Sequence, residues 1–117
     1  MSIRRFQDQP IWQMSHELTK EVSSITRKFP RSDPENLAHQ MNQSSIELYS
    51  KITELFDKNS CRKTSRDLTH SYNSLHDLKR CYKKSLDLRY ISQNRLIEDV
   101  IIELEVQINY LMESKTA

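Results

Sequence analysis

Basic side chains are concentrated in the third quarter of this 117-residue chain, where they could contact phosphate groups or an acidic partner. Residues 58–90 hold nine Lys or Arg and three Asp, although the whole chain has a net charge of only +2. Arginine binds phosphate through two parallel N–H···O bonds, and lysine adds a compact positive charge. We expect six of these residues to form a phosphate-contacting face: Arg62, Lys63, Arg66, Arg80, Lys83 and Lys84.

An apolar seam in the same segment indicates that this face lies on the outer side of one helix. The seam residues are Leu68, Tyr72, Leu75, Leu78, Tyr82 and Leu86. They recur every three or four residues, which is the spacing of a narrow buried stripe. At 100° per residue, the opposite side carries four bases: Arg62, Arg66, Arg80 and Lys84. No exposed aromatic residue interleaves them, so stacking on bases is not indicated. An ordinary solvated helix surface is the other interpretation.

The residues that usually support catalysis or metal binding are not arranged for it. The four histidines form no HxxxH or HExxH pair, and Glu35 precedes His39 by four residues rather than the three of a di-metal bundle. The chain has no glycine, which excludes P-loops and dinucleotide-binding fingerprints. No serine or cysteine has a base at a recognisable spacing. We therefore expect no enzyme activity, no cofactor and no metal.

The absence of glycine also predicts an all-α fold. Sheets need tight turns with positive φ, which glycine usually supplies. Apolar residues recur at helical spacing in four segments that short polar links separate. We expect a single domain over 1–117, an antiparallel up-down-up-down four-helix bundle. Its helices should span about 10–28, 33–57, 61–88 and 93–113.

Local signals predict where these helices begin and end. Ser32-Asp33-Pro34-Glu35 has the pattern of a capping box, with Glu35 three residues after the cap Ser32. Ser92 is the expected N-cap of the last helix. Phe29-Pro30 should end the first helix, because the residue before a proline is disfavoured in the α region.

The last predicted helix has more apolar side chains than one buried stripe needs. The core stripe is Ile97, Val100, Ile101, Leu104, Ile108 and Leu111. The additional apolar residues are Leu96, Ile102, Val106, Tyr110 and Met112. Because an apolar face without a partner favours association, we expect the protein to bind copies of itself.

The two cysteines and the apolar runs suggest a reduced, cytoplasmic protein with no membrane partner. On one helix Cys61 and Cys81 would be about 30 Å apart, which is too far for a disulfide. Cys81 lies next to the apolar seam and is expected to be a small packed residue. The longest purely apolar run is Val100-Ile101-Ile102, far too short to span a bilayer.

Short motifs spread along the chain match a known pattern. They are Phe6-x-Asp8, Trp12-Gln13-x-x-His16-Glu17-Leu18, Ile25-Thr26-x-Lys28-Phe29-Pro30, Leu37-x-x-Gln40-Met41, Ser74-Leu75-x-x-Leu78 and Leu86-x-Leu88-Arg89-Tyr90-Ile91-Ser92. Together they resemble the bacterial four-helix bundle proteins encoded in ribosomal RNA intervening sequences, over nearly the whole chain without gaps. The resemblance implies a homopentamer. A relative on the same fold is the accessory variability protein (Avd) of diversity-generating retroelements, a basic pentameric barrel that binds nucleic acid and a reverse transcriptase.

The chain departs from that family's pattern at several positions. Asn42-Gln43 stands where the family usually has a basic pair. Tyr49 and Glu54-Leu55 replace a proline-containing segment that ends in Glu-Gly, and Arg89 replaces a glycine. Phosphate contacts of the missing basic pair cannot be transferred to this chain, so the third helix would have to supply them.

The sequence therefore predicts a non-enzymatic homo-oligomeric scaffold that binds RNA or DNA electrostatically. The resemblance suggests an Avd-like accessory role beside a reverse transcriptase. The alternative is a protein-interaction scaffold of the ribosomal RNA intervening-sequence family, whose basic face docks an acidic partner.

Overall fold

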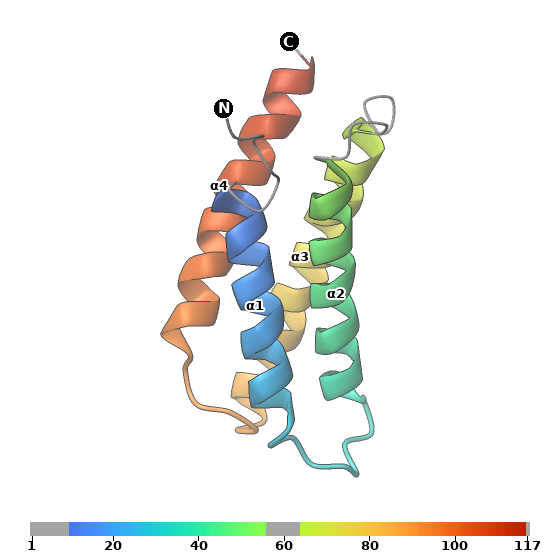
Figure 1. Ribbon diagram of the computed structural model, residues 1–117. Coiled ribbons are helices and arrows are strands. Elements are labelled where there is room, and N and C mark those ends of the chain that lie inside the picture. The colour runs from blue at the N-terminus through green and yellow to red at the C-terminus, as the bar shows by residue number, and fades with distance from the viewer. Residues whose placement is uncertain (1–9, 56–63, 117) are drawn as a thin grey trace, which may run out of the picture.

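The computed structural model is an antiparallel bundle of four helices (Figure 1). The helices are α1 (Pro10–Thr26), α2 (Leu37–Leu55), α3 (Thr64–Asp87) and α4 (Arg95–Thr116). The structure describes residues 10–55 and 64–116, and this part of the chain contains no strand. Neighbouring helices pack in the order α1, α2, α3, α4 and back to α1. The predicted all-α four-helix fold is confirmed.

The α1–α2 and α3–α4 connections, residues 27–36 and 88–94, lie at the same end of the bundle (Figure 1). We call this the loop end. It is the lower end in Figure 1, and both α2 and α4 begin there. None of the described helices has the length and apolar character needed to cross a membrane.

The bundle is held together by the apolar stripes that the spacing predicts. The side chains buried from the four helices include Leu18, Val22, Leu37, Met41, Leu48, Ile52, Leu68, Leu75, Leu78, Ile97, Leu104 and Ile108. Fully burying one such side chain stabilises the fold by about 1.5–3 kcal/mol. Two predicted seam residues of α3, Tyr72 and Leu86, lie at the edge of this core and are only half-buried.

Small side chains fill the contact between α2 and α3. Ser71, Ser74, Cys81 and Ser85 of α3 are buried on one helix face, and Ser44 is buried on α2. Small side chains allow two helix axes to approach closely. Burial raises the pKa of the Cys81 thiol, which keeps it in the unreactive protonated form. The expectation that Cys81 is a packed residue is confirmed, whereas Cys61 lies outside the described residues.

The predicted start of the second helix is wrong, because α2 begins at Leu37 and its N-terminus is capped by Asp33 rather than Ser32. The Asp33 carboxylate accepts hydrogen bonds from the backbone N–H of Leu37 at 2.7 Å and of Glu35 at 3.4 Å. Residues 30–36 form turns instead of helix, and Asn36 has a φ of 54°. The Ser-x-x-Glu pattern failed because a neighbouring carboxylate has two acceptor oxygens and takes both N–H groups.

Asn94, rather than Ser92, caps α4. Its side-chain oxygen accepts a hydrogen bond from the backbone N–H of Ile97 at 2.9 Å. Its own backbone N–H donates to the Tyr82 hydroxyl at 2.7 Å, and that hydroxyl donates to Glu98 at 2.8 Å. Tyr82 on α3 thus fixes the residue at which α4 can begin.

The remaining predicted boundaries are close to the observed ones where they can be compared. α1 ends at Thr26, two residues before the expected Lys28, and α3 ends at Asp87. α3 closes with the backbone bonds Tyr90 N to Ser85 O and Arg89 N to Leu86 O, both 3.0 Å. This is a Schellman motif, with Arg89 in the left-handed region at φ 63°. The predicted end at 57 and start at 61 lie outside the described residues.

The two candidate caps of α4 can be separated by alanine substitution. Asn94→Ala should lower the free energy of unfolding by about 1 kcal/mol, because it leaves the Ile97 N–H without its acceptor. Ser92→Ala should have little effect and serves as the matched control. Urea denaturation followed by circular dichroism measures both. Equal losses in the two variants would contradict the assignment of the cap.

Asp33 should make the stability of the bundle depend on acid pH. The backbone N–H of Leu37, aided by the Tyr90 hydroxyl, holds the pKa of Asp33 below its ordinary value of 3.8. The stabilisation is therefore present above that value and is lost as the pH falls through the lower pKa of the folded state. Asp33→Asn should be less stable than the wild type at neutral pH.

The difference in melting temperature between Asp33→Asn and the wild type should shrink below about pH 4. A series of thermal melts between about pH 2 and pH 7 tests this. A difference that stays constant over the whole series would rule out the carboxylate charge as its cause.

Candidate nucleic-acid interface

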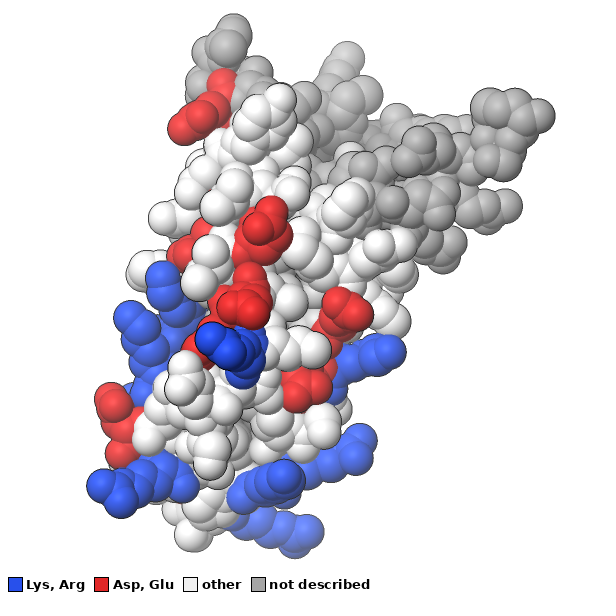
Figure 2. Space-filling view, turned by 90° about the vertical axis from the view of Figure 1, so that its left-hand side faces the viewer, with Lys and Arg blue, Asp and Glu red and all other residues white. Residues whose placement is uncertain are grey.

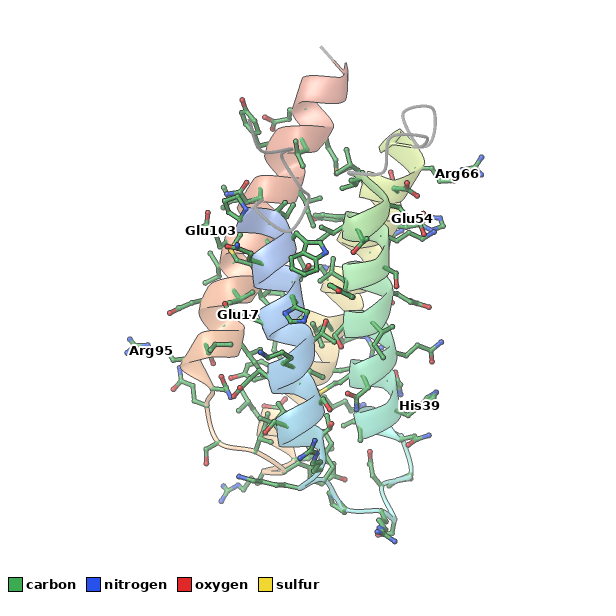
Figure 3. The ribbon with its side chains drawn as sticks, in the orientation of Figure 1. Glu17, His39, Glu54, Arg66, Arg95 and Glu103 are labelled. Atoms are coloured by element: carbon green, nitrogen blue, oxygen red, sulfur yellow. The ribbon has the colours of Figure 1, made fainter. Side chains whose placement is uncertain are left out.

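Three of the six predicted contact residues, Arg80, Lys83 and Lys84, lie together on the last turns of α3 near the loop end. Arg66 lies near the other end of α3, about 21 Å away along the continuous helix. Its exposed side chain points away from the bundle (Figure 3). Arg62 and Lys63 lie outside the described residues. The structure therefore gathers part of the predicted set into one place and separates Arg66 from it.

The gathered residues line a shallow groove along the outer surface of α3, with a volume of about 470 Å³. Its lining residues are His76, Lys79, Arg80, Lys83, Lys84, Asp87 and Leu88. We call it the α3 groove. The lining residues are spaced three and four apart along α3, so their side chains are neighbours on one helix face. Lys79 and His76 were not predicted as part of this face, because at 100° per residue both lie closer to the seam than the four bases opposite it.

Two lysines of the α3 groove already have carboxylate partners from other helices or connections. Lys84 Nζ lies 2.6 Å from an oxygen of Glu35, just before α2, and Lys79 Nζ lies 3.3 Å from an oxygen of Glu105 on α4. All four side chains are partly exposed, so each pair contributes only about 0–1 kcal/mol. The helical projection of α3 alone could not show these partners.

Arg80 and Lys83 supply the uncompensated charge of the α3 groove. Arg80 donates a hydrogen bond to the neutral side-chain oxygen of Gln40 at 3.3 Å. Neither Arg80 nor Lys83 forms an ion pair with an acidic residue in the described part of the chain. Asp87 is the one acidic residue that lines the groove. Both cations are exposed, so an anion can reach them from solvent.

Charge is also divided along the length of the bundle. Lys and Arg gather toward the loop end in Figure 2, and acidic side chains run up the middle of the same view. Arg95 at the start of α4 points outward from the lower half of the bundle, and Glu103 lies farther up the same helix (Figure 3). The exposed bases Arg27, Lys28, Arg31 and Arg89 belong to the two connections. An anionic ligand would therefore be drawn toward the loop end.

One histidine and the aromatic residues of α1 and α2 pack together, whereas His39 of α2 is exposed. Trp12 stacks on His16 with ring centroids 5.1 Å apart, and Tyr49 is tilted against both rings. The Trp12 indole N–H donates to Thr53 Oγ1 at 2.9 Å. Among residues 10–55 and 64–116, no three His, Cys, Asp or Glu side chains are placed to hold a metal ion.

The excess apolar surface predicted on the last helix is present on α4. Leu96 is 43% exposed, Ile102 58%, Val106 57% and Tyr110 68%. They alternate along the helix with the exposed acids Asp99 and Glu103. Met112, which was also expected to contribute, is half-buried. Large apolar side chains gathered on one exposed helix face commonly mark an interaction surface.

Comparison with known proteins agrees with the bundle and with the motifs in the sequence. No match was found among curated proteins. The model of the 23S rRNA-intervening sequence protein family matches residues 7–113, which include α1, α2, α3 and most of α4. The chain therefore belongs to the 23S rRNA-intervening sequence protein family.

Proposed function

We propose that the protein is a non-enzymatic module that binds the phosphate backbone of RNA or DNA in the α3 groove. The observation that carries the proposal is the pair Arg80 and Lys83, two exposed cations about one helical turn apart with no acidic partner in the described chain. Lys79 and Lys84 extend the positive surface on either side. Arg66 would make a separate contact farther along α3.

Phosphate would bind here by electrostatic attraction and counterion release. Side chains one turn apart on a helix are about 5–6 Å from each other, so neighbouring cations can engage neighbouring phosphates. Lys79 and Lys84 would exchange their carboxylate partners for phosphate at little cost, because exposed ion pairs are weak. Nothing in the α3 groove is shaped to read base edges, so binding would be independent of sequence and would weaken steeply with salt.

A second candidate function, docking of an acidic protein partner, is favoured by the two ion pairs of the α3 groove. Lys84 and Lys79 already form ion pairs with Glu35 and Glu105, so a carboxylate can reach each of these lysines. Competition separates the two candidates. Heparin or RNA should displace a bound nucleic acid, and it should displace a bound acidic protein only if that protein also binds in the α3 groove. The resemblance to Avd suggests a reverse transcriptase as one such partner.

We also propose that the protein is a homo-oligomer, a pentamer as the family resemblance implies, in which the exposed apolar residues of α4 contact the next copy. Burying these side chains between copies would remove apolar surface from water, and each Å² removed stabilises the contact by roughly 25 cal/mol. The acids Asp99 and Glu103 between the apolar residues would meet basic or polar groups of the neighbour.

Charge reversal in the α3 groove tests the proposed function. In a filter-binding series, the double variant Arg80→Glu/Lys83→Glu should bind duplex more weakly. Its plot of log affinity against log salt should be shallower by about 1.8, since each lost phosphate contact removes about 0.9. Lys20→Glu reverses one exposed base on α1 and is the matched control for the single variant Lys83→Glu. Lys20→Glu should bind duplex like the wild type, whereas Lys83→Glu should bind more weakly. No binding by the wild type at low salt would refute the proposal.

Light scattering tests self-association. The wild type should have a mass several times that of the 14.0 kDa chain. Ile102→Glu or Val106→Glu should lower the mass, because either places a charge in the buried contact. Ile46→Glu is the matched control, since Ile46 is 53% exposed but lies on α2. A wild-type mass of one chain, or equal effects of all three variants, would contradict an α4 interface.

A further inference from the structure

A second hollow lies at the loop end, between the end of α1 and the α3–α4 connection. It has a volume of about 560 Å³, within the range of small-molecule sites. Its lining residues are Ile25, Lys28, Arg89, Tyr90, Ile91, Ser92, Gln93 and Asn94. None of them is acidic, whereas three other hollows on the described surface each include at least one Asp or Glu. The loop-end hollow thus combines two positive charges with no lining negative charge.

The two cations of the hollow come from different connections and are free of acidic partners. Lys28 follows α1 and Arg89 follows α3, and both are exposed. Neither forms an ion pair with an acidic residue of the described chain, in contrast to Lys79 and Lys84 of the α3 groove. We propose that the loop-end hollow binds a phosphate monoester, the group found at the end of a nucleic-acid strand or on a free nucleotide.

The backbone around Arg89 is fixed, so its side chain leaves the turn at a defined position. The Schellman bonds of Tyr90 N and Arg89 N hold the turn from the α3 side. Tyr90 holds it from the other side, because its hydroxyl donates to Asp33 at 2.9 Å and its ring packs on Phe29 with centroids 5.4 Å apart. Because the turn is held on both sides, no backbone ordering at Arg89 is needed when a phosphate binds.

The carboxylates next to the hollow are already hydrogen-bonded to its lining residues: Asp33 accepts from the Tyr90 hydroxyl at 2.9 Å, and two others accept from side-chain amides. Glu21 accepts from the Asn94 amide at 2.8 Å, and Glu98 accepts from the Gln93 amide at 2.9 Å and from Tyr82. These bonds leave the Ser92 hydroxyl as the neutral donor that can join Lys28 and Arg89 at a phosphate. The hollow also lies at the N-terminus of α4, whose helix dipole adds a partial positive charge.

This proposal extends the proposed function. It rests on that function where the phosphate is the end of a bound strand, and it is independent of it where the phosphate belongs to a free nucleotide. In the strand-end case, the α3 groove would hold the backbone while the loop-end hollow takes the terminal phosphate. In the free-nucleotide case, the hollow would act without the groove. The same full-length protein can be tested with both kinds of ligand.

Binding of oligonucleotides that differ only at their ends tests the hollow. By fluorescence anisotropy, a single strand with a 5′- or 3′-terminal phosphate should bind about tenfold more tightly than the same strand with hydroxyl ends. AMP tests the free-nucleotide source by calorimetry. Arg89→Gly should abolish the advantage of the terminal phosphate. The variant should keep or raise the melting temperature, because glycine adopts the φ of 63° more readily than arginine.

Matched variants and outcomes separate this proposal from the proposed function. Lys28→Ala should reproduce the loss, whereas Arg31→Ala, a base of the same end that does not line the hollow, should not. Equal affinity for phosphate and hydroxyl ends together with no AMP binding would overturn the hollow and leave the α3 groove standing. AMP binding that Arg89→Gly abolishes, in a protein that binds neither strand, would support the hollow and refute the proposed function. Tight end binding that survives Arg89→Gly would overturn the assignment of the hollow.

Discussion

The hydrogen bond from the Tyr90 hydroxyl to the Asp33 carboxylate joins the two connections of the loop end, 57 residues apart in the sequence. The other oxygen of Asp33 accepts the Leu37 N–H and so sets the first residue of α2. Because α2 begins there, Glu35 and Gln40 lie beside Lys84 and Arg80 of α3. The bond between the two turns thus helps to hold the partners of two cations beside the α3 groove.

Tyr82 plays the corresponding part at the start of α4. Its hydroxyl accepts the Asn94 N–H and donates to Glu98, and burial raises its pKa to about 12. The hydrogen bonds from Gln93 and Tyr82 lower the pKa of Glu98, so the neutral phenol and the charged carboxylate stabilise each other. Since a raised phenol pKa gives stability that is lost only as the pH rises from about 10 toward 12, this link is intact at physiological pH.

The core could be predicted from the sequence because it depends on one period within each helix. Leu75, Leu78 and Leu104 were expected inside and are inside. The caps were predicted less well, since Ser32 and Asp33 offer competing oxygens and only the fold decides between them. In a chain without glycine, Asn36 and Arg89 adopt the left-handed turns. Asparagine is enriched in that conformation, and Arg89 stands where the family usually has a glycine, so each position carries a signal that the helical period does not contain.

The α3 groove was predicted only in part, because the period of one helix shows which side chains share a face but not which side chains of other helices meet them. A helical projection places Arg80, Lys83 and Lys84 on one side of α3, but it contains no information about Glu35 or Glu105. Those partners arrive only when α2 and α4 are positioned. The loop-end hollow could not be predicted from spacing at all, because Lys28 and Arg89 are brought together by the up-down order of the helices.

The basic groove lies on α3 and the exposed apolar residues lie on α4, and this separation would allow a weak phosphate site to hold a nucleic acid through assembly. Two uncompensated cations in the α3 groove, with two more lysines partly neutralised, would make only a modest phosphate site in a single chain. The apolar residues proposed for self-association are on α4, so assembly need not cover the groove. A closed ring repeats every surface by rotation about one axis, so copies of the groove would act on the same strand. Linked weak sites gain affinity through effective concentration, and oligomerisation would then set the affinity more than any single side chain.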